Sequence, residues 1–387
     1  MTIEKGIEYI GVTDREIKLF EGLFPVRHGV TYNSYLVKDE KTAVMDSVDE
    51  RFVGEWLENL KRALGGASPD YLVVQHMEPD HSAGILRFHE AYPSAKIVAS
   101  SRAFVIMKQL FGREFADCKQ VVKEGDVLPL GKKKLVFIEA PLVHWPEVIV
   151  SYEESTGTLF SADAFGRFGG RENDGEWAEE ARRYYFGIVG KFGRQVRVLL
   201  QKLSNFGIRK ICPLHGPVLR ENLGEYLELY WKWSGYLAEE RGTLIVYASV
   251  YGNTARAAKA MEEELSLRGE KTARRDLGTD EFFEAVANAF RYDKLVVAST
   301  TYNGGVFPTV KAYLDALLVR GFKNRKVGFI ENGSWSPTAA GGMREILSSA
   351  EGLSFVGTAT VRTALNETSR EEIAALARAL TEESHNH

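Results

Sequence analysis

Short apolar runs rich in β-branched residues alternate with amphipathic segments in the first part of the chain. Apolar runs bounded by polar or glycine-containing turns predict strands, and apolar residues spaced three or four apart predict helices. We therefore expect helices over residues 51–64 and 102–111. The expected strands cover residues 31–38, 41–45, 71–75, 96–99, 134–139, 148–152, 158–161 and 209–212. A helical pattern over residues 221–240 closes this part, and Arg241-Gly242 marks its end.

A stricter rhythm of strand and helix follows. We expect strands over residues 244–249, 271–276, 294–299, 326–331 and 355–361, and helices over residues 254–267, 281–290, 309–319, 342–350 and 370–380. Five such units predict a parallel, doubly wound α/β sheet with its ligand beyond the carboxyl ends of the strands. A single core seldom grows past roughly 250 to 300 residues. The 387-residue chain is therefore predicted to hold two domains, residues 1–241 and 242–387.

Charge and cysteine content narrow the classes of function. The net charge of −4 gives no basic field for nucleic acid. No apolar run approaches the roughly 20 residues of a membrane span, and the first residues lack a signal-peptide pattern, so we expect a cytoplasmic protein without a membrane partner. Cys118 and Cys212 are the only cysteines. An iron–sulfur cluster or a rubredoxin-type iron site needs about four cysteines, so neither is expected.

Candidate metal ligands stand directly after several of the predicted strands. Four of them leave the strand at residues 71–75 together, and Pro79 among them argues against a helix and for a fixed turn. One further candidate follows each of three later apolar runs. Together, four imidazoles and three carboxylates suit two metal ions bridged by one carboxylate. These seven residues are His76, Glu78, Asp80, His81, His144, Asp163 and His215.

A His-x-Glu-x-Asp-His loop followed by His, Asp and His at strand ends resembles the metallo-β-lactamase-like domain of the flavodiiron proteins, or A-type flavoproteins. The resemblance covers nearly the whole chain. It implies an αββα metallo-β-lactamase-like domain followed by a flavodoxin-like domain with a five-stranded parallel sheet. It also implies that Asp163 bridges two irons, one held by His76, Glu78 and His144 and the other by Asp80, His81 and His215.

The ligand chemistry favours iron independently of the resemblance. A carboxylate such as Glu78 in place of an imidazole favours iron or manganese over zinc. The resemblance implies that this replacement has taken place here, because most hydrolases of the resembled fold have histidine at that position. Three carboxylates and one bridging hydroxide also balance the charge of two ferrous ions. Near the metals, Tyr184 and Tyr185 either supply a hydroxyl or pack. Relatives often carry an extra histidine there, for which Glu21 and His28 are the candidates.

Three loops of the second domain suit a flavin phosphate and its ring. Hydroxyls and backbone N–H groups at the start of a helix bind an anion without a lysine, and the absence of a Gly-Lys-Ser/Thr ending argues against a nucleotide-hydrolysing loop. Tyr302 and Trp335 can lie against a flat ring. The loops resemble the FMN-binding loops of flavodoxins, although Thr300 stands where many relatives have proline. The candidate residues are Ser249, Val250, Tyr251, Gly252, Asn253, Thr254, Ser299, Thr300, Thr301, Tyr302, Asn303, Gly304, Gly305, Asn332, Gly333, Ser334 and Trp335.

The first hypothesis for function is an oxidoreductase that passes electrons from FMN to two non-haem irons. The resemblance implies reduction of dioxygen to water or of nitric oxide to nitrous oxide, and the sequence does not rank the two gases. It also implies an external donor, which is rubredoxin, a flavin reductase or a deazaflavin coenzyme. One short junction at Arg241-Gly242 leaves little slack for the flavin to reach the metals of its own chain, so a head-to-tail homodimer, or a dimer of such dimers, is expected.

Two other classes of function fit parts of the sequence. The first is a zinc-dependent hydrolase of the metallo-β-lactamase fold fused to a flavodoxin-like module, with Glu78 as an unusual ligand. The second is an electron-transfer protein whose metal domain is structural. Metal analysis separates the hydrolase from the oxidoreductase, and loss of metal without loss of oxygen reduction would identify the electron carrier.

Overall fold

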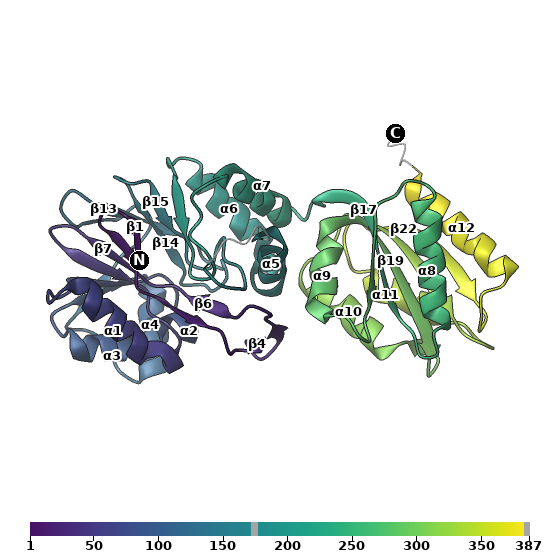
Figure 1. Cartoon of the computed structure of the whole chain (residues 1–387), viewed down its shortest axis with the longest axis horizontal. Coiled ribbons are helices and arrows are strands. Elements are labelled where there is room, and N and C mark those ends of the chain that lie inside the picture. The colour runs from purple at the N-terminus through teal and green to yellow at the C-terminus, as the bar shows by residue number, and fades with distance from the viewer. Residues whose placement is uncertain (172–176, 383–387) are drawn as a thin grey trace. The chain divides into compact units, whose positions relative to one another are not determined.

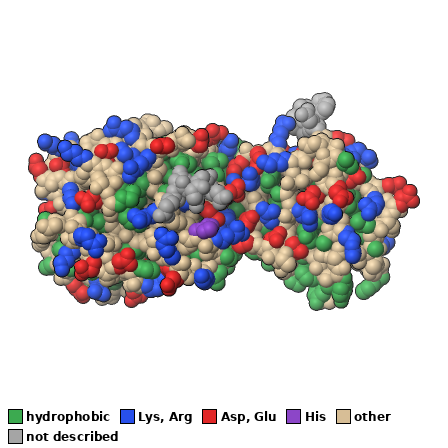
Figure 2. Space-filling view, viewed as in Figure 1, with side chains coloured by type: hydrophobic (Ala, Val, Ile, Leu, Met, Phe, Trp, Pro, Cys, Tyr) green, Lys and Arg blue, Asp and Glu red, His purple; other side chains and the backbone are tan. Residues whose placement is uncertain are grey.

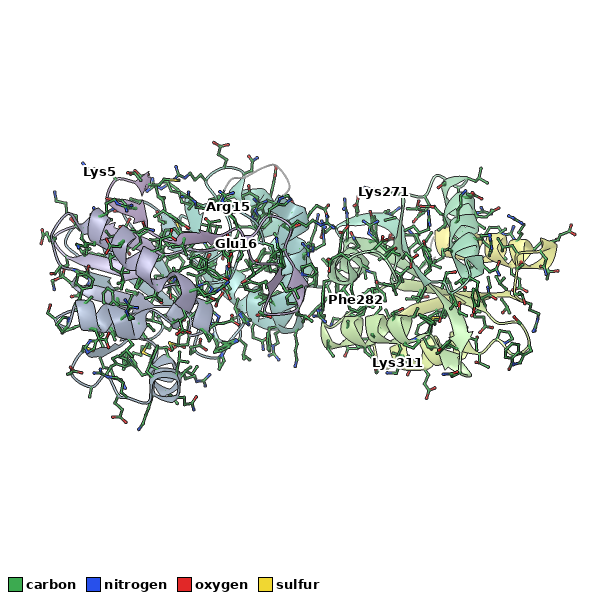
Figure 3. The ribbon with its side chains drawn as sticks, turned by 60° about the horizontal axis from the view of Figure 1, so that its bottom comes forward. Lys5, Arg15, Glu16, Lys271, Phe282 and Lys311 are labelled. Atoms are coloured by element: carbon green, nitrogen blue, oxygen red, sulfur yellow. The ribbon has the colours of Figure 1, made fainter. Side chains whose placement is uncertain are left out.

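The computed structural model describes residues 1–171 and 177–382. The chain divides into two compact units, Met1–Trp231 and Lys232–His387. Each unit has its own sheets, covered by its own helices (Figure 1). Charged side chains such as Lys5 in the first unit and Lys271 and Lys311 in the second lie on the surface (Figure 3). The apolar strands are thus left to form the interior of each unit.

Two sheets make up the first unit. The larger has the order β1 (Thr2–Glu4), β2 (Ile7–Tyr9), β7 (Tyr35–Lys38), β8 (Thr42–Met45), β9 (Tyr71–Val74), β10 (Lys96–Ala99) and β11 (Lys119–Val121). The smaller has the order β12 (Val127–Pro129), β13 (Lys134–Glu139), β14 (Ile149–Glu153), β15 (Thr158–Phe160) and β16 (Lys210–Cys212). Two short pairs stand apart: β3 (Val12–Asp14) with β6 (Val30–Tyr32), and β4 (Leu19–Phe20) with β5 (Phe24–Pro25).

The core of this unit lies between the two sheets. Met45 and Val73 from the larger sheet pack in one cluster with Phe137 and Ile149 from the smaller. Helices α1 (Val53–Leu64), α3 (Ile85–Ala91) and α4 (Ser101–Phe111) lie outside the larger sheet, and α5 (Trp177–Tyr184), α6 (Gly193–Leu203) and α7 (Leu223–Ser234) lie outside the smaller one (Figure 1). The layers confirm the predicted αββα sandwich.

The predicted strand over residues 31–38 is wrong as one element. It is broken into β6 and β7, which belong to different sheets. The break is at Asn33, whose backbone N–H donates to Leu214 O at 2.8 Å. Its side-chain amide donates to Pro213 O at 2.8 Å and to Gly216 O at 2.9 Å. These bonds to a loop far along the chain replace the strand pairing that a continuous run would have made.

The predicted turn at Pro79 is also wrong. A short helix, α2 (Pro79–Ser82), begins at this proline. Proline is tolerated at the first position of a helix, where its missing N–H would have no partner within the helix and its fixed φ is already helical. Asp80 and His81 therefore leave the loop on a single helical turn.

The second unit is one parallel sheet with helices on both faces. Its strand order is β18 (Thr272–Asp276), β17 (Glu240–Ala248), β19 (Tyr292–Tyr302), β21 (Lys326–Asn332) and β22 (Ser354–Val361), with β20 (Gly305–Val306) antiparallel to β19. Helices α8 (Asn253–Ser266) and α12 (Glu367–Thr381) share one face, and α9 (Phe282–Arg291), α10 (Pro308–Val319) and α11 (Ala339–Leu347) share the other (Figure 1). This is the flavodoxin strand order, as predicted.

The chain passes into the second unit earlier than the sequence indicates. Helix α7 ends at Ser234, so the helix predicted over residues 221–240 is wrong in its last part, and β17 already begins at Glu240. Tyr236 has a φ of 56°, which no continuing helix allows. Its carbonyl accepts a hydrogen bond from Arg325 at 2.8 Å, within the second unit. The boundary predicted at Arg241-Gly242 therefore lies inside the second compact unit.

Within residues 1–171 and 177–382, no helix has the length and apolar character that crossing a membrane requires.

Replacing Asn33 by alanine is expected to destabilise the first unit by about 1 to 3 kcal/mol, because two buried carbonyls lose their donors. The change should appear as a lower midpoint of that unit's unfolding transition in calorimetry. Asn205→Ala is the matched control, since the exposed Asn205 amide makes a single 3.3 Å bond to Lys202 O. Equal midpoints for the two variants would contradict the role given to Asn33.

Candidate metal centre

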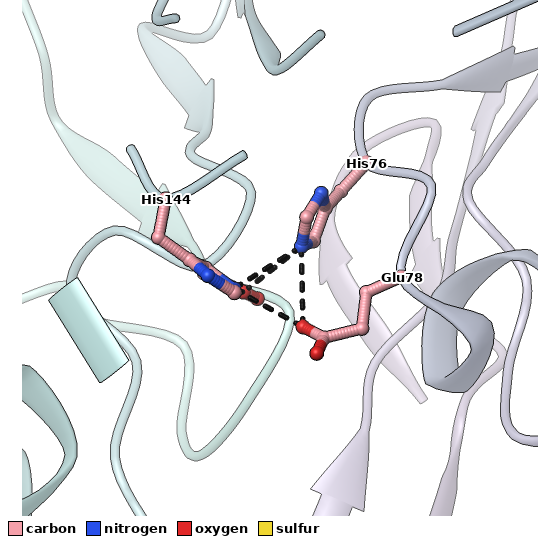
Figure 4. A group of neighbouring side chains, drawn as sticks. His76, Glu78 and His144 are labelled. Carbon is pink, nitrogen blue, oxygen red and sulfur yellow. Dashed lines mark hydrogen bonds and ion pairs between the residues drawn. The ribbon is translucent and has the colours of Figure 1, made fainter. Parts of the chain in front are cut away.

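His76, Glu78 and His144 form one group of potential ligand atoms (Figure 4). Nε2 of His76 lies 3.3 Å from both Glu78 Oε2 and His144 Nε2, and Nε2 of His144 lies 3.1 Å from Glu78 Oε2. Oδ2 of Asp163 faces the same point, 2.9 Å from His144 Nε2 and 3.4 Å from His76 Nε2. Four donor atoms from three separate strand ends thus surround one small space.

Asp80, His81 and His215 form a second group. Nε2 of His81 lies 3.0 Å from His215 Nε2, and each of these nitrogens lies 3.3 Å from Asp80 Oδ2. The other oxygen of Asp163, Oδ1, lies 3.3 Å from His81 Nε2 and 3.8 Å from His215 Nε2. Asp163 therefore presents one oxygen to each group, and all seven candidate ligands are brought together.

The spacing of these atoms fits metal ions. Ligand atoms about 2.1 Å from one ion lie about 3.0 to 3.4 Å apart in octahedral or tetrahedral geometry, close to the separations within each group. Two imidazole nitrogens facing each other at 3.0 Å cannot both donate a hydrogen bond when neutral. Within the described residues, both oxygens of Asp80 and Oδ1 of Asp163 are buried without a hydrogen-bond donor. A pair of cations would satisfy all of them.

Buried acceptors fix the orientation of two of the histidines. Nδ1 of His76 donates to Glu147 Oε1 at 2.9 Å, and Nδ1 of His215 donates to Thr31 O at 2.7 Å. A proton held on Nδ1 leaves the lone pair on Nε2, the atom that faces each group. Such partners also make the ring a better metal ligand.

Asp46 fixes the backbone at the start of the loop that carries His76, Glu78, Asp80 and His81. Its Oδ1 accepts from Gln75 N at 2.7 Å and from His76 N at 3.3 Å, and its Oδ2 accepts from the Gln75 side chain at 3.1 Å. Burial raises the pKa of Asp46 to about 6 in spite of these donors. The neighbouring Ser47 binds His81 O through both its N–H and its hydroxyl. The loop is therefore positioned by β8 before any metal arrives.

Protons occupy the site when metal does not. Burial opposes a charge on His144, but hydrogen bonds with Asp163 and Glu78 outweigh it and raise the pKa of His144 to about 9. Burial likewise opposes a charge on His76 and His215, and their carboxylate neighbours raise both pKa values. Without metal, the nearby carboxylates thus stabilise the positively charged, protonated forms of these histidines.

Of the two candidate tyrosines, Tyr184 lies beside the metal groups. It is fully buried at the end of α5, with its ring 5.4 Å from that of His215. Burial and the carboxylates of Asp163 and Glu78 raise its pKa well above the ordinary value, so the phenol keeps its proton. Tyr185 begins a π-helical turn, Tyr185–Val189, and packs with Phe186 and Tyr230.

Glu21, rather than His28, lies against the metal groups. The turn between β4 and β5 brings Glu21 next to Glu78, although the Glu21 side chain still reaches solvent. Partial burial and the carboxylates of Glu78 and Asp80 raise the pKa of Glu21 to about 7. From the same hairpin, Phe20 places its ring 5.3 Å from that of His215. None of the contacts found for the exposed His28 within the described residues involves a candidate ligand.

A separate cavity of about 490 Å³ lies at the carboxyl ends of the strands in the second unit. Fourteen of the candidate flavin residues line it; Gly252, Ser299 and Gly305 do not. The Ser299 hydroxyl instead accepts a hydrogen bond from Phe307 N at 3.1 Å. Gly305, in β20, pairs with Tyr302 of β19. Ser336 and Thr363, which are not among the candidate residues, also line the cavity.

The cavity fits a phosphate joined to a flat ring. Ser249 Oγ is buried without a hydrogen-bond partner among the described residues, close to the start of α8. The hydroxyls of Thr254 and Thr300, two residues that also line the cavity, lie 2.8 Å apart. At the mouth, Tyr251 and Trp335 are 89% and 91% exposed, more than packing against the protein alone would leave. Figure 2 shows hydrophobic side chains gathered at one end of this unit.

Comparison with known proteins matches part of the first unit to one family and nearly the whole chain to several relatives. Residues 30–216 match the model described as ODP family beta lactamase. An anaerobic nitric oxide reductase flavorubredoxin from Vibrio vulnificus is 30% identical over 347 residues, 86% of this chain and 70% of that protein. An Escherichia coli flavorubredoxin is 29% identical over 87% of this chain and 72% of its own length.

Solved structures agree over nearly the full length. Rubredoxin oxygen:oxidoreductase from Desulfovibrio gigas has a TM-score of 0.90 and 26% identity, covering 98% of this chain and 97% of that one. The flavodiiron protein from Giardia intestinalis has a TM-score of 0.90 and 25% identity, covering 98% and 95%. This chain belongs to the flavodiiron protein family. It is accordingly an oxidoreductase.

Two residues that orient the histidines of this flavodiiron protein were missed by the sequence reasoning: Thr31 and Glu147. Glu147 had a signal, since a ligating histidine commonly donates to a carboxylate and Glu147 follows His144 by three residues. It serves His76 instead. Thr31 acts through its backbone carbonyl, which any residue type provides.

Adding ferrous iron to the metal-free flavodiiron protein at pH 7 is expected to release about two or more protons per chain, because histidines with raised pKa values must lose their protons to bind metal. Metal affinity should therefore rise with pH through about pH 9, the pKa of His144, where half of the His144 imidazoles have lost their extra proton. Calorimetry in buffers of different ionisation enthalpy measures the release. No proton release at pH 7 would mean that the empty site holds neutral imidazoles.

Proposed function

We propose that this flavodiiron protein passes electrons from FMN to a non-haem diiron centre that reduces dioxygen to water, nitric oxide to nitrous oxide, or both. The names of the relatives support both gases, since one group is named for nitric oxide and one structure for oxygen. The observation that carries the proposal is the position of Asp163, with Oδ1 toward one histidine pair and Oδ2 toward the other.

The proposed ligands follow from that arrangement. His76, Glu78 and His144 would hold one iron, Asp80, His81 and His215 the other, and Asp163 would bridge them. When bound, two irons would supply electrons and coordination positions for a diatomic gas. The three carboxylates keep the charge of such a pair balanced. No sulfur stands among the ligands, which suits iron better than a soft metal.

Side chains around the centre control water and protons. Phe20 and Tyr184 contact His215, and Trp145 lies 5.4 Å from the His76 ring, so three aromatic residues cover the histidines. They exclude bulk water from the ligand atoms, which strengthens every charge interaction inside. Tyr184 keeps a proton at its hydroxyl, and Glu21 can hold a proton where the hairpin meets solvent.

The cavity of the second unit would hold FMN. The Ser249 and Thr254 hydroxyls and the first turn of α8 would bind the phosphate, as in other anion sites at helix N-termini. Tyr302 and Trp335 would lie against the ring. When bound, FMN would accept electrons from an external donor, singly or in pairs, and could pass them to metals one at a time. We propose rubredoxin, a flavin reductase or a deazaflavin coenzyme as that donor.

We further propose that the active form is a head-to-tail homodimer, alone or paired into a tetramer. The flavin cavity and the metal groups each lie at strand ends of a different unit. A two-fold axis would make two equivalent flavin-to-metal contacts between partners.

The reductase proposal is tested with two variants that each remove one cofactor. Asp163→Asn should lose iron and gas reduction while keeping FMN, because the bridging charge is lost. Thr254→Arg, which fills the phosphate loop, should lose FMN and keep iron. Metal and flavin analysis and anaerobic steady-state kinetics with dioxygen and with nitric oxide measure these outcomes.

Glu78→His serves as the control, since it exchanges one competent ligand for another and should retain more iron than Asp163→Asn. Stoichiometric zinc in protein made with ample iron would favour the hydrolase. Full oxygen reduction by iron-free Asp163→Asn would identify an electron carrier with a structural metal domain.

Mixed dimers test the pairing of subunits. A metal-dead chain (His81→Ala with Asp163→Ala) and the flavin-dead Thr254→Arg chain are inactive as homodimers. Random pairing gives roughly half mixed dimers, each with one intact flavin facing one intact metal site, so about a quarter of wild-type activity should return. Mixed dimers that are present but inactive would mean that electrons pass within one chain.

A further inference from the structure

His89, Asp117 and Cys118 form a third group of potential metal ligands, made of residues that the diiron proposal does not use. His89 stands in α3, and Cys118 directly precedes the edge strand β11. The two residues are 29 positions apart, yet Cys118 Sγ lies 3.6 Å from His89 Nδ1. Both are buried, at 5% and 8% exposure, whereas Asp117 is exposed. We propose that this group is a zinc site, separate from the diiron centre.

The distance between the sulfur and the nitrogen is the first support. A tetrahedral zinc ion with Zn–S of about 2.3 Å and Zn–N of about 2.05 Å places the two ligand atoms about 3.6 Å apart. The observed separation of 3.6 Å therefore matches that of a zinc-bound sulfur and nitrogen pair. Asp117 completes a sulfur, nitrogen and oxygen set, with all three ligand atoms within 4.8 Å of one another. Water would fill the fourth position.

Rigid anchoring of the two buried ligands is the second support. The Cys118 carbonyl accepts from Ile97 N at 2.8 Å, and its N–H donates to Phe115 O at 3.2 Å, which fixes it against β10. The His89 ring packs edge-on to Phe115 at 5.6 Å. Asp117 is exposed to solvent, so an ion can reach the buried His89 and Cys118 from the side of Asp117. A thiolate beside an imidazole and one carboxylate selects zinc over magnesium or calcium.

Two features compete with the metal. The Cys118 thiol can donate to Phe115 O, 3.7 Å away, and the Arg113 guanidinium lies 3.4 Å from His89 Nε2. Arg113 is exposed and stacked on Phe115 at 5.0 Å, so it can turn to solvent when Nε2 takes the ring proton. Removing Arg113 should then strengthen binding, because a cation and a competing hydrogen bond both leave. That expected direction distinguishes a metal site from simple packing.

The test uses the iron- and FMN-loaded protein with one equivalent of Zn²⁺, followed by desalting, zinc analysis and X-ray absorption at the zinc edge. Zinc in the diiron centre would have only nitrogen and oxygen neighbours. We expect about one zinc per chain with one sulfur neighbour at about 2.3 Å. Cys118→Ser should lose the sulfur signal and at least about 100-fold in affinity, while Cys212→Ala, in the core, should retain both. A wild-type protein without a zinc–sulfur contact would overturn the site.

Two exposed positions keep the test independent of folding. Asp117→Asn should weaken zinc binding about tenfold, and Arg113→Gln should tighten it a few-fold. Both side chains are exposed, so both variants should fold as the wild type does. Unchanged affinity in both would contradict the assignment even if Cys118→Ser binds less zinc.

Discussion

The first unit depends on one constraint: three carboxylates are almost completely buried at one place and need cations beside them. The side chains of Glu78, Asp80 and Asp163 are only 16%, 13% and 1% exposed. Charges removed from water to this degree are costly unless cations meet them. The histidines lie where such cations would be coordinated, and in their absence the pKa shifts show the same demand met by protons. The surrounding fold keeps the seven side chains convergent against their own repulsion.

That convergence is achieved by strand ends. Four of the candidate ligands each follow a strand of the sandwich, and the strands fix the backbone positions from which the side chains converge. These ligands are His76, His144, Asp163 and His215. Asp46 and Asn33 then tie loops to strands far away in sequence, and Glu147 and Thr31 set the ring nitrogens. The second unit follows the same rule, because its cavity also lies beyond strand ends. In both units the chemistry resides in loops whose position the sheets determine.

The sequence allowed the sheets and the candidate ligands to be predicted for one reason: each ligand follows an apolar run that is recognisable without tertiary information. Strands of two or three residues, such as β4 and β5, have too little periodicity to be seen, and these carry Glu21 to the metal groups. Glu147 was missed because its role depends on which histidine it meets in space. The end of α7 was misplaced because the left-handed Tyr236 carries no glycine signal.

The two kinds of metal group in the first unit also differ in what they would accept. The two groups that share Asp163 offer oxygen and imidazole nitrogen around two adjacent positions, whereas the His89, Asp117 and Cys118 group offers one sulfur ligand and a single position. Affinity order alone would let zinc displace ferrous iron from nitrogen and oxygen ligands. A separate site with a sulfur ligand would hold zinc in preference, so the proposed third site would reduce competition for the iron positions within the same chain. Ligand type, rather than distance between the sites, would then decide which metal each one holds.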